Sequence, residues 1–339
     1  MQQLNPQLEQ WLQQLSLFKG FGLSPLAGDA SFRRYYRLIP TLTQEQSYIA
    51  MDASLEVSSC QAFVAIAEGL AAQGVNTPKI FAADLQQGFI LLSDFGNRLY
   101  LNELSTENAA TLYRRALDAL LEIQSCRQLA NWTLPLFDEH FLQSELNEFQ
   151  NWVLTRYLAL TPSPAEKSML CETFEFLIKS ATEQPQVFMH RDYHSANLMV
   201  LPNQQVGVLD FQDACLGPIT YDVVSLLRDC YIDWPEAEVQ ALLAYYQQQL
   251  AEVGVKLALS DFQQWFDLMG VQRHLKAAFI FARKYLRDQT PRYLQYLPRT
   301  FNYVAKVSAQ YPQLANLHEY LNETLQPLLQ QRGEACLVG

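Results

Sequence analysis

The sequence predicts an α+β protein in which a small antiparallel sheet with one crossing helix precedes a large, mainly helical region. Short apolar and aromatic runs bounded by polar turns fill much of residues 1–95. From about residue 97 onward, apolar residues recur at helical spacing over long segments. A chain of 339 residues is also long enough for two lobes. We therefore expect an N-terminal lobe over 1–95 and a C-terminal lobe over 96–339.

The expected elements of the first lobe follow from these runs. Residues 5–18 read as an amphipathic helix with Leu8, Trp11 and Leu12 on one face. The expected strands cover 33–39, 47–52, 79–83 and 88–93, and a second helix covers 60–72 and ends at Gly74.

The second lobe is expected to be helical with one interruption. The helices are expected over 107–125, 138–158, 164–182, 219–231, 235–253, 260–287 and 314–330. Between them, residues 186–211 hold three short apolar runs separated by polar clusters. A strand-rich insert inside a helical region is unusual, so we expect the chemistry to lie there.

Composition limits the classes of function. Hydrophobic residues make up 49% of the chain and charged residues 17%, which favours a large core and disfavours disorder. The net charge of −11 argues against nucleic-acid partners, which need a basic surface. A local group of arginines could still bind an anionic substrate.

The cysteines and the N-terminus bear on location. The six cysteines are scattered and form no CxxC pair, as is typical of buried thiols in a reducing compartment. The first ten residues are polar, without a signal-peptide pattern, and no apolar run approaches the roughly 18 residues of a membrane span. We expect a cytoplasmic protein with no membrane partner; the sequence leaves the oligomeric state open.

The segment that carries chemistry is His190-Arg191-Asp192-Tyr193-His194-Ser195-Ala196-Asn197. Its H-R-D-x4-N pattern is that of kinase catalytic loops. Thirteen residues after Asn197 comes Asp210, which follows an apolar strand. A four-residue gap can aim Asp192 and Asn197 into one cleft, and a hairpin can return the chain so that Asp210 meets the same ion.

Each of these side chains has a predicted role. Asp192 would accept or orient the proton of a substrate hydroxyl. Asn197 and Asp210 would hold Mg²⁺, which prefers oxygen ligands, between the phosphates. We therefore expect two carboxylates and an amide to meet a metal-bound triphosphate in a cleft between the lobes.

With two further elements, this segment resembles the aminoglycoside phosphotransferase and choline kinase-like superfamily. These elements are Leu209-Asp210-Phe211-Gln212-Asp213 and Gly217-Pro218-Ile219-Thr220-Tyr221-Asp222. The resemblance implies a two-lobed protein-kinase-like fold, with ATP as co-substrate and Mg²⁺ as cofactor. It also implies structural roles for His190 and for Asp222, which would brace the catalytic loop. Protein kinases are disfavoured, because only eleven residues separate Asp210 from Asp222 and no A-P-E motif follows.

The resemblance also places the nucleotide. A loop of Gly28, Asp29, Ala30, Ser31, Phe32 and Arg33 resembles the phosphate-covering loop of the superfamily, with one glycine where protein kinases have three. The segment Leu91-Leu92-Ser93-Asp94-Phe95-Gly96 resembles the link between lobes, where backbone near Ser93 and Phe95 would pair with adenine.

One departure concerns the lysine that kinases place on the third strand and pair with a glutamate on the crossing helix. Met51 stands nearest to the lysine position, and apolar Phe63 stands where the acid is expected, with Glu68 nearby. A buried glutamate without its lysine would be destabilising, so the absence of the lysine is consistent with the absence of the glutamate. We expect Arg33, Arg34 or Arg37 to supply the charge, or else all three to lie on a solvated strand.

A narrower resemblance concerns the substrate. Gly-Asp-Ala-Ser-Phe-Arg-Arg-Tyr, the catalytic loop and Gly-Pro-Ile-Thr-Tyr-Asp-Val-Val-Ser-Leu-Leu-Arg-Asp-Cys-Tyr resemble bacterial anomeric kinases of cell-wall amino sugars. This implies phosphorylation of the C1 hydroxyl of N-acetylmuramate and N-acetylglucosamine in peptidoglycan recycling. The residues expected to contact the sugar are Tyr193, His194, Asp213, Arg228 and Arg273.

Other functions stay open at this point. Aminoglycosides are less favoured, because residues 260–300 are rich in Arg and Lys, whereas polycationic drugs need an acidic pocket. A kinase for choline, homoserine or another sugar is an alternative. A nucleotide-binding pseudokinase is a second, suggested by the absent strand lysine and opposed by the intact Asp192, Asn197 and Asp210.

Overall fold

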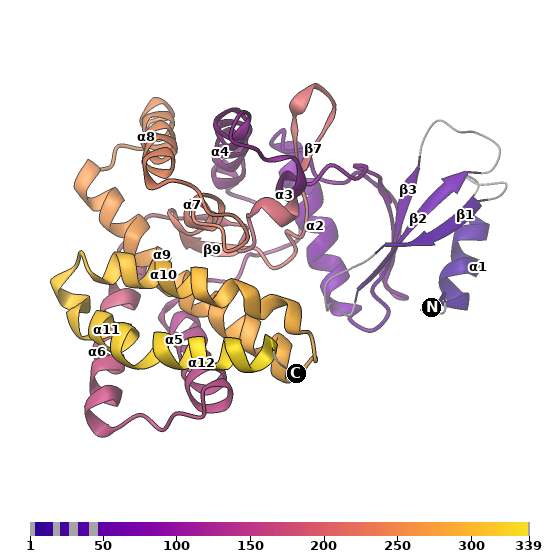
Figure 1. The fold of residues 1–339 in the computed structure, drawn as a ribbon. Helices are drawn as coiled ribbons and strands as arrows, with labels where there is room; N and C mark the ends of the chain where they lie inside the picture. Colours follow the sequence, from indigo (N-terminus) through magenta and orange to yellow (C-terminus); the bar gives the residue numbers. More distant parts are fainter. Residues whose placement is uncertain (1–3, 16–20, 27–32, 41–46, 338–339) are drawn as a thin grey trace. The chain divides into compact units, whose positions relative to one another are not determined.

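The computed structural model describes residues 4–15, 21–26, 33–40 and 47–337 (Figure 1). The chain divides into two compact units. The first, called here the sheet unit, comprises residues 1–103, 126–133 and 197–214; the second, the helical unit, comprises 104–125, 134–196 and 215–339. This division differs from the single break expected after residue 95, because the segments 126–133 and 197–214 join the sheet unit.

The sheet unit is built on five antiparallel strands in the order β1-β2-β3-β5-β4. These are β1 (Phe21–Pro25), β2 (Arg34–Pro40), β3 (Tyr48–Asp52), β4 (Ile80–Asp84) and β5 (Phe89–Ser93). The four expected strands are confirmed. Strand β1 was not expected, because five residues with Gly22 and Pro25 carry a weak strand signal.

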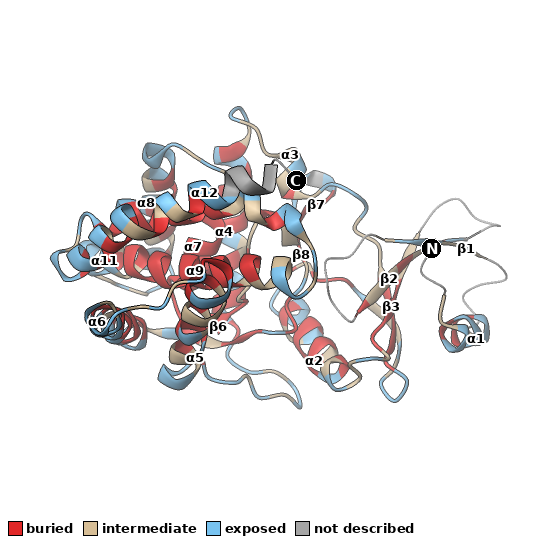
Figure 2. Cartoon of the chain, turned by 60° about the horizontal axis from the view of Figure 1, so that its bottom comes forward, coloured by how far each residue is buried: buried red, intermediate tan, exposed pale blue. Residues whose placement is uncertain are grey.

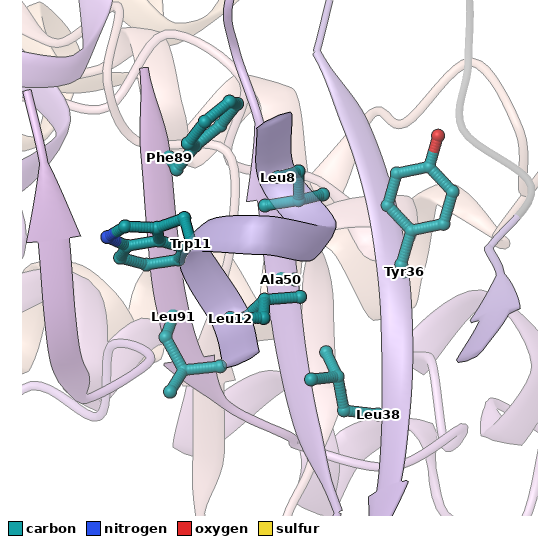
Figure 3. Close-up of a cluster of buried hydrophobic side chains, with 8 residues drawn as sticks. All are labelled: Leu8, Trp11, Leu12, Tyr36, Leu38, Ala50, Phe89 and Leu91. Carbon is teal, nitrogen blue, oxygen red and sulfur yellow. The ribbon is translucent and has the colours of Figure 1, made fainter. Parts of the chain in front are cut away.

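Helix α1 (Pro6–Gln14) covers one face of this sheet (Figure 3). Asn5 caps the helix by accepting from the backbone N–H of Gln7, and Pro6 occupies the first turn. Leu8, Trp11 and Leu12 pack on Tyr36, Leu38, Ala50, Phe89 and Leu91. Each large side chain buried here stabilises the fold by roughly 1.5–3 kcal/mol. Because side chains alternate along a strand, Tyr35 and Met51 lie on the opposite face.

The second helix of the sheet unit, α2 (Ser58–Ala72), begins two residues before the expected start. Its Phe63 ring lies 4.9 Å from the ring of Phe211. The side chain where the acid was expected is therefore an aromatic ring that packs on Phe211, the residue after Asp210.

A hairpin of β7 (Leu198–Val200) and β8 (Val206–Val208) also belongs to the sheet unit. Asn76 holds it: the Asn76 carbonyl accepts from the N–H of Val208 at 2.9 Å, and its side chain donates to Val206 at 3.1 Å. The short helix α3 (Tyr100–Glu103) lies in this unit too.

The helical unit is organised around α9 (Leu259–Leu286), which is buried along most of its length (Figure 2). The other helices are α4 (Ala109–Ser125), α5 (Glu139–Phe149), α6 (Pro164–Thr182), α7 (Tyr221–Leu227), α8 (Glu236–Glu252), α10 (Leu297–Ser308), α11 (Ala315–Tyr320) and α12 (Gln326–Leu337). Strands β6 (Gln186–Met189) and β9 (Cys215–Pro218) pair antiparallel, and β6 leads directly into the segment predicted to carry the chemistry.

Several expectations for this unit need correction. Residues 138–158 are not one α-helix, since a π-helical stretch over Gln150–Tyr157 continues α5. The expected helix over 314–330 is divided into α11, a π-helical turn and α12. Helix α10 and strand β9 were not expected. Among the described residues, no helix is long and apolar enough to cross a membrane.

Candidate active site

The end of the β7–β8 hairpin brings Asn197 and Asp210 together. The last cross-strand pair is Leu198 with Val208, so the residues just outside it share one end of the hairpin. The N–H of Leu209 donates to the carbonyl of Asn197 at 3.0 Å. The Asn197 side-chain amide then donates to the Asp210 carboxylate at 3.5 Å. The hairpin that the sequence analysis expected between Asn197 and Asp210 is thus what places these two groups side by side.

Asp210 is held in an uncommon backbone conformation. Its φ of 61° lies in the left-handed region, which Asp adopts more readily than most residues but which still carries a cost. Its second carboxylate oxygen accepts from the side-chain amide of Gln212 at 2.9 Å. The carboxylate is therefore fixed in direction, with the amide of Asn197 next to it.

Asp192 belongs to the helical unit and lies among cationic groups. Burial alone would raise the pKa of its carboxyl. The positive charges of Lys276, His194, Arg191 and Arg273 outweigh that effect and lower the pKa to about 2. The side chain is consequently a carboxylate at any pH near neutrality.

The loop that carries Asp192 is fixed by a buried carboxylate at the start of α7. Asp222 accepts from the backbone N–H groups of His190 and Arg191, at 2.6 and 3.0 Å. Arg191 has a φ of 75°, which an Arg seldom adopts without support. His190 is fully buried, and its Nδ1 accepts from the N–H of Asp192 at 3.2 Å.

A second buried carboxylate, which the sequence analysis missed, fixes the same loop further along. Asp229 accepts from both the N–H and the hydroxyl of Ser195, at 3.0 and 2.5 Å. Asp229 belongs to the motif from Gly217 to Tyr231 that the sequence analysis quoted, but it was given no role there. Nothing local marks it as a partner of Ser195, 34 residues earlier.

Lys276 is the other functional candidate that the sequence analysis missed. It is buried on α9, donates to the Tyr221 hydroxyl at 2.7 Å and lies 3.8 Å from Glu145. Glu145 also pairs with Arg191 at 3.3 Å and accepts from Gln272 at 2.9 Å. Lys276 had been grouped with the basic residues of 260–300, although its spacing from Arg273 puts both on one helix face.

Two of the residues expected to contact the sugar are buried and have partners within the helical unit. Tyr193 is fully buried and its hydroxyl donates to the carbonyl of Ala116 at 2.7 Å, so it packs in the core of the helical unit. Arg228 is buried in ion pairs with Asp267 at 2.8 Å and Glu236 at 3.0 Å. Both side chains thus have partners within the fold, and their expected sugar contacts stay predictions.

Three other expected sugar contacts stay predictions. Arg273 is buried and donates to the hydroxyl of Ser225, while its charge acts on Asp192. His194 is half-buried, with its ring 5.5 Å from that of Tyr231. Asp213 is exposed in the sheet unit and accepts from Gln212 at 3.3 Å.

The expected nucleotide contacts are described only in part. Gly28, Asp29, Ala30, Ser31 and Phe32 lie outside the described residues. Ser93 ends β5, and its hydroxyl accepts from the N–H of Lys79 at 2.9 Å. Phe95 packs against Gly207, where a Cβ would come within 2.8 Å of its ring. Arg33 is buried beside Glu56.

Comparison with known proteins decides the family. The sequence profile of the phosphotransferase enzyme family matches residues 22–255, which is more than half of the chain. The chain belongs to this family. It is a kinase that transfers a phosphoryl group to a hydroxyl acceptor.

The family members most informative about this chain are curated bacterial proteins. The chain is 43% identical to the N-acetylmuramate/N-acetylglucosamine kinase of Pseudomonas aeruginosa over 94% of its length and 95% of that protein. It is 36% identical to the kinase of the same name from Neisseria meningitidis, over 93% and 94% of the two chains.

Solved structures of this phosphotransferase family share the fold. An ADP-bound aminoglycoside phosphotransferase superposes with a TM-score of 0.61 at 14% identity, covering 90% of this chain and 99% of the other. The choline kinase of Streptococcus pneumoniae gives a TM-score of 0.62 at 13% identity, covering 88% and 99%. The expected two-lobed, kinase-like α+β fold is confirmed.

Proposed function

We propose that this protein is an ATP-dependent kinase that phosphorylates the anomeric C1 hydroxyl of N-acetylmuramate and N-acetylglucosamine in the recycling of peptidoglycan. The observation that carries the substrate is the identity of 43% with the Pseudomonas aeruginosa kinase, which extends over 94% of the chain. Similarity over almost the full length includes the helical region in which this family builds its acceptor pocket.

In the proposed reaction, Asp192 accepts a hydrogen bond from the C1 hydroxyl and directs its oxygen at the γ-phosphorus of ATP. A new oxygen–phosphorus bond forms at C1 while the bond between the γ-phosphorus and ADP breaks, and the hydroxyl proton passes to Asp192. A carboxylate with a pKa of about 2 is a weak base, so the proton transfers late. Orientation is then the main contribution of Asp192, as suits a loose phosphoryl-transfer transition state.

Asn197 and Asp210 fit a magnesium site. One carboxylate and one side-chain amide lie in contact at the end of a rigid hairpin. Turning the Asn197 amide about its last bond would present its oxygen where its nitrogen now lies. Mg²⁺ is commonly held by one or two protein oxygens together with water and substrate phosphates. When bound, the ion would neutralise charge on the phosphates.

A panel of acceptors with C1 free or blocked tests the substrate and the hydroxyl together. ADP release from ATP is measured with N-acetylmuramate, N-acetylglucosamine, the methyl glycoside of N-acetylglucosamine, choline, homoserine and an aminoglycoside. We expect turnover with the two free sugars and none with the methyl glycoside, because its C1 oxygen carries no proton. Turnover of the blocked sugar would exclude C1, and turnover of choline or homoserine alone would exclude the sugars.

A further inference from the structure

Kinases hold the nucleotide phosphates with a lysine on the third strand that pairs with a glutamate on the crossing helix. In the described residues of the sheet unit, β3 carries no lysine, and Phe63 stands on α2 where the glutamate was expected. Met51 is fully buried on β3, and its neighbour across the sheet on β2 is Tyr35. Directly opposed residues in antiparallel strands point to the same face. Helix α2 connects this face to Asp210: Ser59 near its start accepts from Arg33, and one turn later the Phe63 ring packs on Phe211, the residue after Asp210.

Of the three arginines that could replace the lysine, Arg37 is already used. It forms a two-pronged ion pair with Asp94, at 2.6 and 3.0 Å, and also donates to Asn97 and to the carbonyl of Gly96. These bonds tie β2 to the segment after β5. Its guanidinium is therefore held at the far end of the strand by four acceptors.

Arg34 is excluded by the alternation of the strand. Successive side chains on a strand point to opposite faces, so Arg34 lies on the face opposite to Tyr35. That is the face of Tyr36 and Leu38. Tyr36 and Leu38 belong to the core beneath α1. Arg34 thus lies on the face of the sheet that looks away from Asp210.

Arg33 has the properties that the missing lysine would need. It lies two residues before Tyr35, on the same side of the chain, and gives Tyr35 a side-chain hydrogen bond. It is buried, its Nη2 lies 3.4 Å from the Glu56 carboxylate, and its Nε donates to the hydroxyl of Ser59 at 3.4 Å. Ser59 in turn donates to the carbonyl of Glu56, so the start of α2 fixes the guanidinium.

We propose that Arg33 and Glu56 form a relocated version of the absent ion pair, in which Arg33 binds the phosphates of ATP and Glu56 positions it. The inference rests on the proposed use of ATP. It moves the cation from β3 to the residue before β2, and the acid from within the crossing helix to the turn before it. A guanidinium fork can bind phosphate oxygens in pairs, which suits a cation that approaches from a different strand.

Calorimetric titration with MgATP and with adenosine, which carries no phosphate, tests this proposal without any sugar. In Arg33→Met, we expect the MgATP affinity to fall about 10-fold to 100-fold, the usual loss for a hydrogen-bonded charge, while adenosine binding stays unchanged. Glu56→Gln should lower the affinity for MgATP several-fold, because Arg33 keeps its charge but is no longer held in place by an ion pair. Arg34→Gln, the matched control from the other face of β2, should bind MgATP like wild type.

The possible outcomes distinguish the assignment of Arg33 and Glu56 from the proposed use of ATP. Equal loss of MgATP and adenosine binding in Arg33→Met would show a structural role and overturn the assignment. Unchanged MgATP affinity in Arg33→Met would also overturn it. If Arg33→Met does not fold, Glu56→Gln decides, since its partly exposed carboxylate tolerates an amide; MgATP binding equal to wild type would then refute the pair. Failure of the wild-type protein to bind MgATP would reject the proposed use of ATP itself.

Discussion

At the scale of single residues, the charge around Asp192 decides what that side chain can do. A buried carboxyl without partners would be neutral near pH 7 and could not accept a proton. The cations of Lys276, Arg191 and Arg273 keep it ionised. They also leave it a weak base, so we expect Asp192 to act mainly by orienting the acceptor hydroxyl and by its negative charge, and less by binding the proton.

Replacing Asp192 by Asn removes the charge and keeps the shape. Asp192→Asn is expected to lower kcat by on the order of 100-fold or more, the usual effect of losing a positioned proton acceptor. MgATP binding should change little, because Asp192 is assigned to the acceptor hydroxyl. Steady-state kinetics together with nucleotide titration check both points, and a variant with wild-type kcat would remove Asp192 from the mechanism.

The pH profile tests the role of Lys276. In the wild type, the pKa of Asp192 is about 2, so kcat/KM should show no loss from this group above about pH 4. Lys276→Met removes an attractive cation and leaves the effect of burial, so the pKa should rise by about 1–3 units and an acid limb should appear. The exposed Lys306→Met is the control and should keep the wild-type profile.

The same shift affects stability in a defined direction. A carboxyl whose pKa is lower in the folded chain than the value of about 3.9 in the unfolded chain stabilises the fold above that pH. Its contribution is lost as the pH falls toward 2. Lys276→Met should therefore reduce the loss of stability at acid pH that arises from Asp192. If the free energy of unfolding fell with pH in Lys276→Met as it does in wild type, Lys276 would not be the cation that lowers the pKa of Asp192.

Residue-scale prediction from the sequence worked where spacing along the chain alone sets the geometry. Asn197 and Asp210 are joined by one hairpin, and their contact follows from its turn. Lys276 and Asp229 were missed because their partners come from distant segments. The hydrogen bond from the Tyr193 hydroxyl to Ala116 on another helix was not predicted for the same reason.

At the scale of elements, the β7–β8 hairpin can position the proposed magnesium ligands only if it lies close to its neighbours. A Cβ on Gly207 would come within 2.8 Å of the Phe95 ring and 3.1 Å of a Leu201 methyl group. Leu201 can move, whereas an aromatic ring packed on the backbone has little freedom. Glycine is therefore required here for close approach.

Gly207→Ala should destabilise the protein by about 1–3 kcal/mol, as overpacking commonly does. It should also weaken Mg²⁺-dependent ATP binding, because Asn197 and Asp210 flank the displaced strands. The control is Gly22→Ala on β1, where a Cβ would meet only the Ile39 carbonyl at 3.9 Å. Urea unfolding and nucleotide titration provide the two readouts; a neutral Gly207→Ala would contradict the packing argument.

The start of α7 acts as a second positioning element. Asp222→Asn keeps one acceptor oxygen where two backbone N–H groups now bind, so one N–H loses its partner at a cost of about 1–3 kcal/mol. Because Arg191 already has a positive φ, the loop should relax and kcat should fall with stability. In the control Asp138→Asn, an exposed helix cap keeps an acceptor, and both quantities should stay near wild type. Unfolding curves and kcat measured side by side check this, and unchanged values in Asp222→Asn would refute the brace.

Element boundaries were predicted well where periodicity is long and regular, as in α6, which matches the expected 164–182. The failures have physical causes. Strand β9 is recognised only through its pairing with β6, and β1 is too short and rich in turn formers. Helix α10 begins with Pro298 in its first turn, which the sequence reading did not take as a helix start.

At the scale of the whole molecule, the catalytic segment spans two compact units. The chain passes from the helical unit to the sheet unit between Ala196 and Asn197, so the proposed acceptor-directing and metal-binding side chains come from different units. The cytoplasmic location, the assignment of nucleotide and sugar to the two units, and the absence of nucleic-acid partners stay predictions from the sequence.

A ligand that binds only the folded chain stabilises it by an amount set by its concentration relative to Kd. MgATP at about 100 times Kd should add about 2.7 kcal/mol to the free energy of unfolding. Chelation of the metal with EDTA, or Asp210→Asn, should remove most of this gain, while Glu68→Gln on the exposed side of α2 should keep it. Thermal unfolding with and without metal measures the difference, and metal-independent stabilisation would contradict the assigned ligands.

A ¹H–³¹P correlation spectrum of the product formed from ATP and N-acetylmuramate tests whether this protein phosphorylates the anomeric hydroxyl. We expect one new phosphorus signal coupled to the anomeric proton of the sugar, which Asp192→Asn forms about 100-fold or more slowly than the wild type. A phosphorus signal coupled to the C6 protons, or only inorganic phosphate and unchanged sugar, would contradict it.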